Sequence, residues 1–174
     1  MDGFVEKLVK KKKTPKDFTV LAGIVVLTLA IASAAFLILY GFLGFLAVLP
    51  SYGIVYLGMK LVAQTNLEFE YLMTNDSLDI DKIIARNKRE RIFSGSCKEF
   101  EAIAKVKGPY YGYHVTDGAR EIFAGTSMDA EELYFISLFY QDRKTVVYFE
   151  PNIRMLESFN RYIPQKFLVD RSMS

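Results

Sequence analysis

The chain has 174 residues, a formal net charge of +2 and a single cysteine, Cys97. One cysteine excludes an internal disulfide and fits a reducing compartment. Residues 1–17 carry six lysines against three acids, whereas residues 60–174 carry sixteen Lys and Arg against seventeen Asp and Glu. Because the basic excess is confined to the start of the chain, the charge of the remainder gives no support to nucleic-acid binding.

The basic start, residues 1–15, is interpreted as a cytoplasmic tail. Lysines that flank an apolar stretch hold that flank on the cytoplasmic side of a membrane. The apolar side chains of residues 4–9 share one helical face, so a short interfacial helix on anionic headgroups is the alternative interpretation. The candidate lipid-headgroup contacts are Lys7, Lys10, Lys11, Lys12, Lys13 and Lys16.

An apolar stretch of forty-two residues, Phe18–Met59, contains no Asp, Glu, Lys or Arg. As one helix it would measure about 63 Å, roughly twice the 30 Å of a bilayer core. We therefore predict a two-span transmembrane hairpin over residues 16–63, with helices at about 16–40 and 43–63. Thr14-Pro15-Lys16-Asp17 before it is typical of a capped helix start.

The turn of this hairpin is predicted at Tyr40–Gly44, which holds two glycines, and the alternative is Pro50–Gly53. With the turn at Tyr40–Gly44, Pro50 is expected to bend the second helix. Small residues at helical spacing suggest where the two helices approach each other. These pairs are Ala30 with Ala34 and Ala47 with Ser51.

The apolar stretch also argues against two interpretations, a cleaved signal peptide and a transport function. Ala32-Ser33-Ala34 resembles a signal-peptide cleavage site, but the apolar run continues for some twenty-five residues beyond it, far longer than a signal sequence requires. Pumps, channels and transporters normally need charged groups inside the membrane, and the spans contain none. The hairpin is therefore interpreted as an anchor.

Two strands with a shared acidic face are predicted after the anchor. Residues 67–74 and 78–85 each alternate apolar and polar side chains, as half-buried strands do, and Asn75-Asp76 between them suits a hairpin turn. Pairing Thr74 with Ser77 gathers four carboxylates on the outward face. They belong to Glu68, Glu70, Asp79 and Asp81.

These carboxylates have two interpretations. Four neighbouring carboxylates suit a hard cation, although no calcium-loop spacing is present. Alternatively they pair with basic residues of a third strand alongside. Those residues, Arg86, Lys88, Arg89 and Arg91, are also a candidate phosphate or lipid-headgroup site, with a solvated turn as the alternative.

The rest of the chain is predicted to be mostly extended. Residues 89–106 form one long or interrupted strand with a bulge at Gly95, and the aromatic residues 110–115 are extended. His114, the only histidine, lacks a neighbouring nucleophile motif and is assigned a structural role. Residues 132–140 and 145–150 form a second hairpin, because their aromatic density favours strand over helix.

A helix is expected from Pro151 to Pro164, and residues 165–174 are expected to be a flexible tail. The helix presents one apolar stripe. The stripe consists of Ile153, Leu156, Phe159 and Ile163.

About seven antiparallel strands followed by a C-terminal helix, over residues 64–164, resemble the pleckstrin-homology-like (PH-like) architecture. The whole chain resembles a Gram-positive bacterial membrane family catalogued as domain of unknown function 6106. The resemblance is carried by the lysine-rich start, Glu68–Tyr71, Leu78–Ile83, Cys97–Glu101 and Phe149–Asn152. It implies an integral membrane protein with an α+β PH-like domain, and it transfers no catalytic residues.

The sequence therefore predicts a multi-pass protein of the cell membrane with both termini in the cytoplasm. Its PH-like domain is expected to be a non-catalytic binding or scaffold module at the inner membrane face, without cofactor or metal. The expected partners are the lipid bilayer and a protein or lipid headgroup, and no nucleic acid. The alternatives are a structural subunit of a membrane complex and a metal-dependent enzyme that uses the outward carboxylates.

Overall fold

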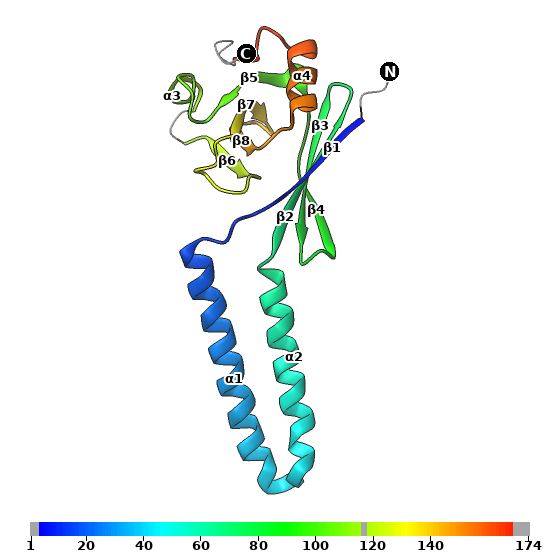
Figure 1. Cartoon of the computed structure of the whole chain (residues 1–174), viewed down its shortest axis with the longest axis vertical. Coiled ribbons are helices and arrows are strands. Elements are labelled where there is room, and N and C mark those ends of the chain that lie inside the picture. Colours follow the sequence, from blue (N-terminus) through cyan, green and yellow to red (C-terminus); the bar gives the residue numbers. More distant parts are fainter. Residues whose placement is uncertain (1–3, 116–117, 169–174) are drawn as a thin grey trace. The chain divides into compact units, whose positions relative to one another are not determined.

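A computed structural model describes residues 4–115 and 118–168 and divides the chain into two compact units (Figure 1). The first unit comprises Met1–Lys12, Glu68–Ile83 and Lys88–Ser174. The second comprises Lys13–Leu67 and Ile84–Asn87. In sequence, the second unit is inserted into the first.

The second unit consists mainly of two helices joined by a short 3₁₀ turn (Figure 1). Helix α1 spans Pro15–Leu43, η1 spans Gly44–Ala47 and α2 spans Val48–Gln64. The chain therefore reverses at η1, which overlaps the predicted turn only at Gly44. The φ of Gly44 is +56°, a conformation that a residue without Cβ adopts without strain.

The start of α1 confirms the predicted cap. The backbone N–H of Asp17 donates to Oγ1 of Thr14 at 3.3 Å, and the N–H of Thr14 donates to the Asp17 carboxylate at 2.8 Å. At the other helix, Pro50 is the third residue of α2. Because it lies in the first turn, Pro50 interrupts no interior hydrogen bond, and the predicted bend is wrong.

The two helices are in close contact at Gly58. A Cβ atom there would lie 2.3 Å from Cγ2 of Thr28, so the contact requires glycine. Ala32 on α1 is also buried, whereas the predicted contact residues Ala30 and Ala34 are exposed. The periodicity of the small residues was thus assigned to the wrong face of α1. On the other side of the turn, Ala47 is buried and Ser51 is half-buried.

A four-stranded sheet in the first unit begins with the N-terminal segment. Its strand order is β1-β2-β3-β4, with bounds Phe4–Lys10, Leu67–Thr74, Ser77–Ile84 and Lys88–Ser96. Strand β1 pairs antiparallel with β2, from Phe4 opposite Thr74 to Lys10 opposite Glu68. The predicted tail and the predicted interfacial helix are both wrong for residues 4–10, because these residues form a strand of the sheet and Val9 is buried in the core.

A second four-stranded sheet has the order β5-β7-β8-β6. The strands span Phe100–Lys105, Arg120–Phe123, Tyr134–Tyr140 and Arg143–Phe149 in chain order. Strand β6 runs parallel to β8, so the strands are not all antiparallel as predicted. Of the two predictions for residues 89–106, a long or an interrupted strand, the second is confirmed, because η2 at Cys97–Glu99 separates β4 from β5.

The two predicted hairpins are present, and both turns use left-handed backbone. Asn75 between β2 and β3 has φ of +54°, and Gln141 and Asp142 between β7 and β8 have φ of +52° and +61°. The paired positive φ values of Gln141 and Asp142 are those of a type I′ turn, whose twist matches the flanking strands. Residues 110–115, in contrast, contain the short helix α3 at Tyr111–His114 rather than a strand.

The main core contains apolar side chains of both sheets and of the C-terminal helix α4, Ile153–Tyr162. Asn152 caps α4 by accepting from the N–H of Met155 at 2.9 Å. Met155 and Phe159 are buried, but Ile153 is 75% exposed, so the predicted stripe is wrong at its first position.

The outer face of the second sheet forms a smaller apolar cluster, which Tyr111 of α3 and Leu168 pack against. Leu168 belongs to the expected flexible tail. Its N–H donates to the carbonyl oxygen of Ile103, and the N–H of Ile103 donates to the carbonyl oxygen of Lys166, both at 2.8 Å. Residues 166–168 are thus tied to β5, whereas the rest of the predicted tail, residues 169–174, lies outside the described residues.

Candidate functional site

The six candidate headgroup lysines belong to different elements. Lys7 and Lys10 are residues of β1. The Lys7 ammonium donates to the carbonyl oxygen of Pro151 at 3.4 Å, and the Lys10 ammonium lies 3.7 Å from the Glu68 carboxylate. Both ammonium groups therefore have partners within the domain.

The other four lysines occupy the connection from β1 to α1 and the first turn of α1. Lys11 and Lys12 follow β1, Lys13 precedes the Thr14 cap, and Lys16 is the second residue of α1. The backbone N–H of Lys12 donates to the carbonyl oxygen of Thr126 at 2.9 Å. This bond ties the connection to the first unit two residues before the cap of α1.

A buried hydrogen-bond network holds the segment to which Lys12 is bonded. The Tyr71 hydroxyl donates to the carbonyl oxygen of Ala124 at 2.5 Å and accepts from the N–H of Glu150 at 3.2 Å. The Glu150 carboxylate accepts from the N–H and the hydroxyl of Thr126, both at 2.6 Å. Burial raises the pKa of Tyr71, so its hydroxyl keeps the proton that it donates.

The four predicted carboxylates pair with basic side chains of other strands of the same sheet. Arg91 on β4 lies 2.8 Å from Asp79 and also pairs with Asp81, and Arg89 lies 3.0 Å from Glu70. Among residues 4–115 and 118–168, no group of three or more Asp, Glu, His or Cys side chains is arranged to hold a metal ion. The ion pairs themselves confirm the ion-pairing interpretation of this face.

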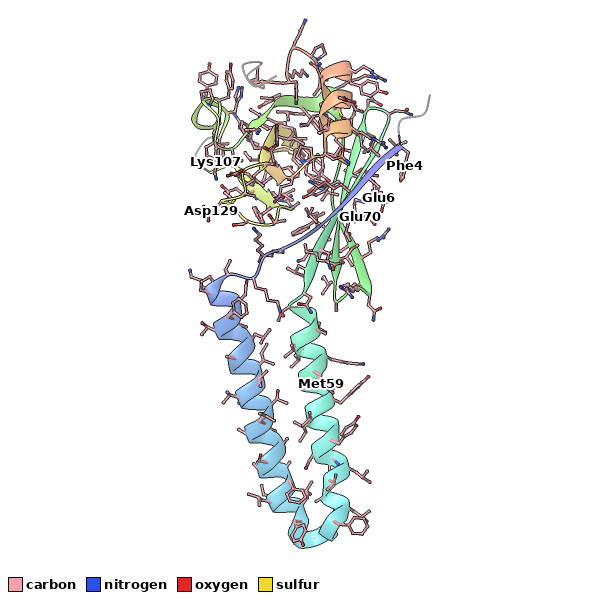
Figure 2. All side chains as sticks on the ribbon, in the orientation of Figure 1. Phe4, Glu6, Met59, Glu70, Lys107 and Asp129 are labelled. Carbon is pink, nitrogen blue, oxygen red and sulfur yellow. The ribbon has the colours of Figure 1, made fainter. Side chains whose placement is uncertain are left out.

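Glu70 is the carboxylate with the most perturbed environment on this face. Its pKa is raised from 4.5, first because it is buried, while Arg89 lowers it and Glu6 raises it. Glu6 is on β1 and Glu70 on the adjacent β2 (Figure 2). One Glu70 oxygen, Oε2, is buried without a hydrogen bond although the Arg89 guanidinium is 3.0 Å away. We infer that this ion pair stabilises the Oε2 atom, because charge attraction needs less alignment than a hydrogen bond.

The single cysteine and histidine have structural surroundings. Cys97 is fully buried, and burial raises the pKa of its thiol to about 12. A buried, protonated thiol is a poor nucleophile. The His114 ring lies 5.2 Å from the Tyr113 ring and 6.4 Å from the Phe135 ring, measured between centroids. Just before α3 in the sequence, the ammonium of Lys107 donates to the carbonyl oxygen of Asp129 at 2.7 Å (Figure 2).

Comparison with known proteins identifies the family. A model described as a bacterial PH-like domain (DUF6106) matches residues 1–169. The chain belongs to this family. The match confirms the resemblance drawn from the sequence, and it includes the helical insertion between β1 and β2 as well as the two sheets. No curated protein and no solved structure matches the chain.

The helical insertion of this DUF6106 protein has the length and composition of a membrane-crossing segment. Taken as one helical stretch, Pro15–Gln64 is one candidate span, and only 6% of its most apolar window is buried within the protein. A core helix of a soluble domain would bury most of that window. The low burial distinguishes this stretch from such a core helix.

The sequence suggested a solvated turn at the basic cluster that begins with Arg86, but it did not give the bounds of the turn at Ile84–Asn87. Ala85 and Arg86 have φ of +52° and +58°, and the N–H of Asn87 donates to the carbonyl oxygen of Ile84 at 3.1 Å. A two-residue turn with this backbone normally carries Asn-Gly or Asp-Gly. No turn residue marks positions 85 and 86, so only the break in strand alternation near Ala85 could have located it.

Proposed function

We propose that this chain is an integral membrane protein whose α1 and α2 each cross the bilayer once, and whose PH-like domain is a non-catalytic binding or scaffold module at the cytoplasmic face. The pairing of β1 with β2 carries the first part of the proposal. Residues before α1 and after α2 share one ladder, from Phe4 opposite Thr74 to Lys10 opposite Glu68. Since a ladder cannot form through a bilayer, both ends of Pro15–Gln64 lie on one side, which requires an even number of crossings.

The lengths of the two helices support two crossings. A spanning helix needs roughly 17–25 apolar residues. Helix α1 has 29 residues, and α2 has 17 and is preceded by the four residues of η1. The close contact of Gly58 with Thr28 suits a membrane, where helices associate through tight packing of small residues.

The charges support a cytoplasmic domain. The second unit contains four basic residues and one acid, and residues 18–59, which include the reversal at η1, contain none. The basic residues are Lys13, Lys16, Lys60 and Arg86. Basic residues beside spans remain in the cytoplasm, and the buried thiol of Cys97 is compatible with that compartment.

The ion pairs of the first sheet support a binding module rather than a metal-dependent enzyme. Asp79 and Asp81 share the guanidinium of Arg91, and Glu70 pairs with Arg89. A carboxylate that binds a catalytic cation must be free to point at it. In this sheet the carboxylates instead pair with basic side chains of other strands.

The topology is tested by thiol labelling in intact cells, because buried Cys97 gives no background. Phe45 in η1 is 79% exposed, so a Phe45→Cys variant should react with a membrane-impermeant maleimide added outside. A Lys98→Cys variant in η2 should react only after permeabilisation. An externally exposed reporter fused after Ser174, or a Phe45→Cys thiol that reacts only from inside, would overturn the orientation.

The binding role is tested by purification of the full chain in a mild detergent with crosslinking in the cell beforehand. A scaffold should return the same crosslinked partner from independent preparations, and substitution of exposed domain residues should abolish that crosslink. If no partner recurs and vesicle flotation shows no lipid preference, the binding role is wrong. Stability that is unchanged by a chelator and an absence of bound metal are the results expected for a non-catalytic domain.

A further inference from the structure

Two acidic side chains lie beside each other on the outward face of the first sheet, where β1 pairs with β2. Glu6 is opposite Leu72 in the ladder and Glu70 is opposite Leu8, so Glu6 and Glu70 are diagonal neighbours on one face (Figure 2). Long side chains at such a diagonal are within reach of each other. Glu70 is only 6% exposed, whereas Glu6 is exposed. A buried carboxyl group on β2 therefore lies next to a hydrated one on β1.

The surroundings of Glu70 contain more acids than bases. The guanidinium of Arg89 on β4 lies 3.0 Å from the Glu70 carboxylate, and this single positive charge cannot neutralise both Glu70 and Glu6. With one proton on the pair, the remaining negative charge is matched by Arg89. The other charged side chains around the pair have partners of opposite sign: Asp81 and Asp79 lie against Arg91, and the Lys10 ammonium is 3.7 Å from Glu68.

Glu70 also has an oxygen on which this proton can reside. Its Oε2 atom is buried and makes no hydrogen bond, so a protonated Glu70 has a hydroxyl that can donate to the Glu6 carboxylate. Burial raises the pKa of Glu70 most, and Arg89 lowers it. The charge of Glu6, a hydrogen bond between the two side chains and the charge of Asp81 raise it further. Two neighbouring carboxyl groups in such a setting hold one proton between them.

We propose that Glu6 and Glu70 are a pH-sensitive clamp, in which one shared proton holds β1 against β2 and the loss of this proton loosens β1. Strand β1 is at the edge of the sheet order β1-β2-β3-β4, so it can detach without separating the other strands of that sheet. The inference does not depend on the proposed membrane topology, because both residues belong to the first unit.

The direction of the pH dependence follows from the exposure of Glu70. When β1 detaches, Glu70 meets water and its pKa returns towards the ordinary value of 4.5. The proton is therefore bound more tightly when β1 is docked. Docking is strongest at low pH, weakens as pH rises from 4.5 through the raised pKa, and is constant above it.

The clamp is tested by amide hydrogen exchange of the full chain in detergent, measured from pH 4.5 upward. Each rate is divided by the intrinsic rate at the same pH to give a protection factor. Protection of the β1 amides should fall by up to about tenfold per pH unit, the dependence expected for release of one proton. Amides of β8, a central strand of the second sheet, exchange when the whole domain opens and should stay more protected. Equal protection of β1 and β8, or β1 protection that does not change with pH, would overturn the proposal.

Three variants assign the effect to the pair. Glu70→Gln is uncharged at every pH and can donate to Glu6, so β1 should keep its protection as pH rises. Glu6→Gln removes a charge that raises the pKa of Glu70, so the fall in protection should be smaller. Glu90→Gln removes an exposed acid of β4 and should keep the wild-type fall. A fall that persists in Glu70→Gln, or one that Glu90→Gln reduces as much as Glu6→Gln does, would refute the role of the pair.

A measurement on the wild type keeps the proposal testable if a variant does not fold. The carboxyl carbon of Glu70 reports its protonation by NMR. This resonance should titrate above pH 4.5, over the same range in which β1 loses protection. Titration over a different range would separate the proton from the strand and contradict the clamp.

Discussion

Replacement of Tyr71 by phenylalanine should destabilise the domain far more than its change in volume suggests. Tyr71 is fully buried, and its hydroxyl is bonded to the carbonyl oxygen of Ala124 and to the N–H of Glu150. The Tyr71→Phe variant keeps the ring and its edge contact with Phe149, whose centroid is 5.8 Å away. The loss is therefore confined to the hydroxyl.

The expected cost follows from two backbone groups that lose their shared partner. A hydrogen bond contributes about 1 kcal/mol net, and a buried group left without a partner costs about 1–3 kcal/mol. Allowing for water that reaches one of the two groups, we expect a loss of roughly 2–4 kcal/mol in the free energy of unfolding. For a domain of this size that corresponds to a fall of about 8–16 °C in Tm.

The assay uses Cys97 as its reporter. A fluorogenic maleimide reacts with this thiol only when the domain opens, so a thermal scan of the full chain in detergent gives Tm. Tyr148→Phe is the matched control, because that hydroxyl meets two side chains at 3.0 Å and 3.3 Å rather than buried backbone groups. A fall in Tm for Tyr71→Phe no larger than that for Tyr148→Phe would refute the reasoning.

Two further predictions concern the helical unit and the acidic face. Gly58→Val should separate α1 from α2, because overpacking costs about 1–3 kcal/mol, and amide hydrogen exchange around Thr28 in nanodiscs should therefore rise. Gly53→Val is the control: a Cβ at Gly53 meets no atom within 4 Å, so this variant should leave the exchange unchanged. Burial raises the pKa of Glu70 in the folded state above 4.5. The contribution of Glu70 to the free energy of unfolding is therefore most favourable below pH 4.5 and is lost as pH rises through the folded-state pKa. Tm of the wild type minus Tm of Glu70→Gln should therefore decrease from pH 4.5 upward. A difference that grows with pH would contradict the sign.

The sequence predicts best those elements in which local pattern and tertiary environment agree. Strands β2 and β3 alternate because one face meets the core, and the β7–β8 hairpin is marked by aromatic residues on both sides of a polar turn. The ion pairs across the acidic face follow from the same alternation, since β4 supplies the arginines that the two preceding strands require. The family resemblance adds the PH-like architecture, which periodicity alone cannot specify.

Strand β1 was missed because its inward face is not uniformly apolar. Lys7 lies between Val5 and Val9 on that face, and its ammonium reaches the carbonyl oxygen of Pro151. From the sequence, this lysine was interpreted as part of a basic flank. The residue that accepts its hydrogen bond is 144 positions away, so the local pattern gives no sign of the pairing. The same limit applies to the Ile84–Asn87 turn, whose backbone is bonded to Asn66 as well as within the turn itself.

The order of synthesis has a consequence for how this domain folds. Strand β1 leaves the ribosome first, but its partner β2 follows only after both helices, and the ladder joins residues up to 70 positions apart. A flexible loop of that length costs about (3/2)RT ln n of closure entropy, whereas a paired α1 and α2 bring its two ends together. Folding of the sheet should therefore wait for the helices to associate, so that a chain whose helices fail to associate exposes β1 as an unpaired edge, open to aggregation.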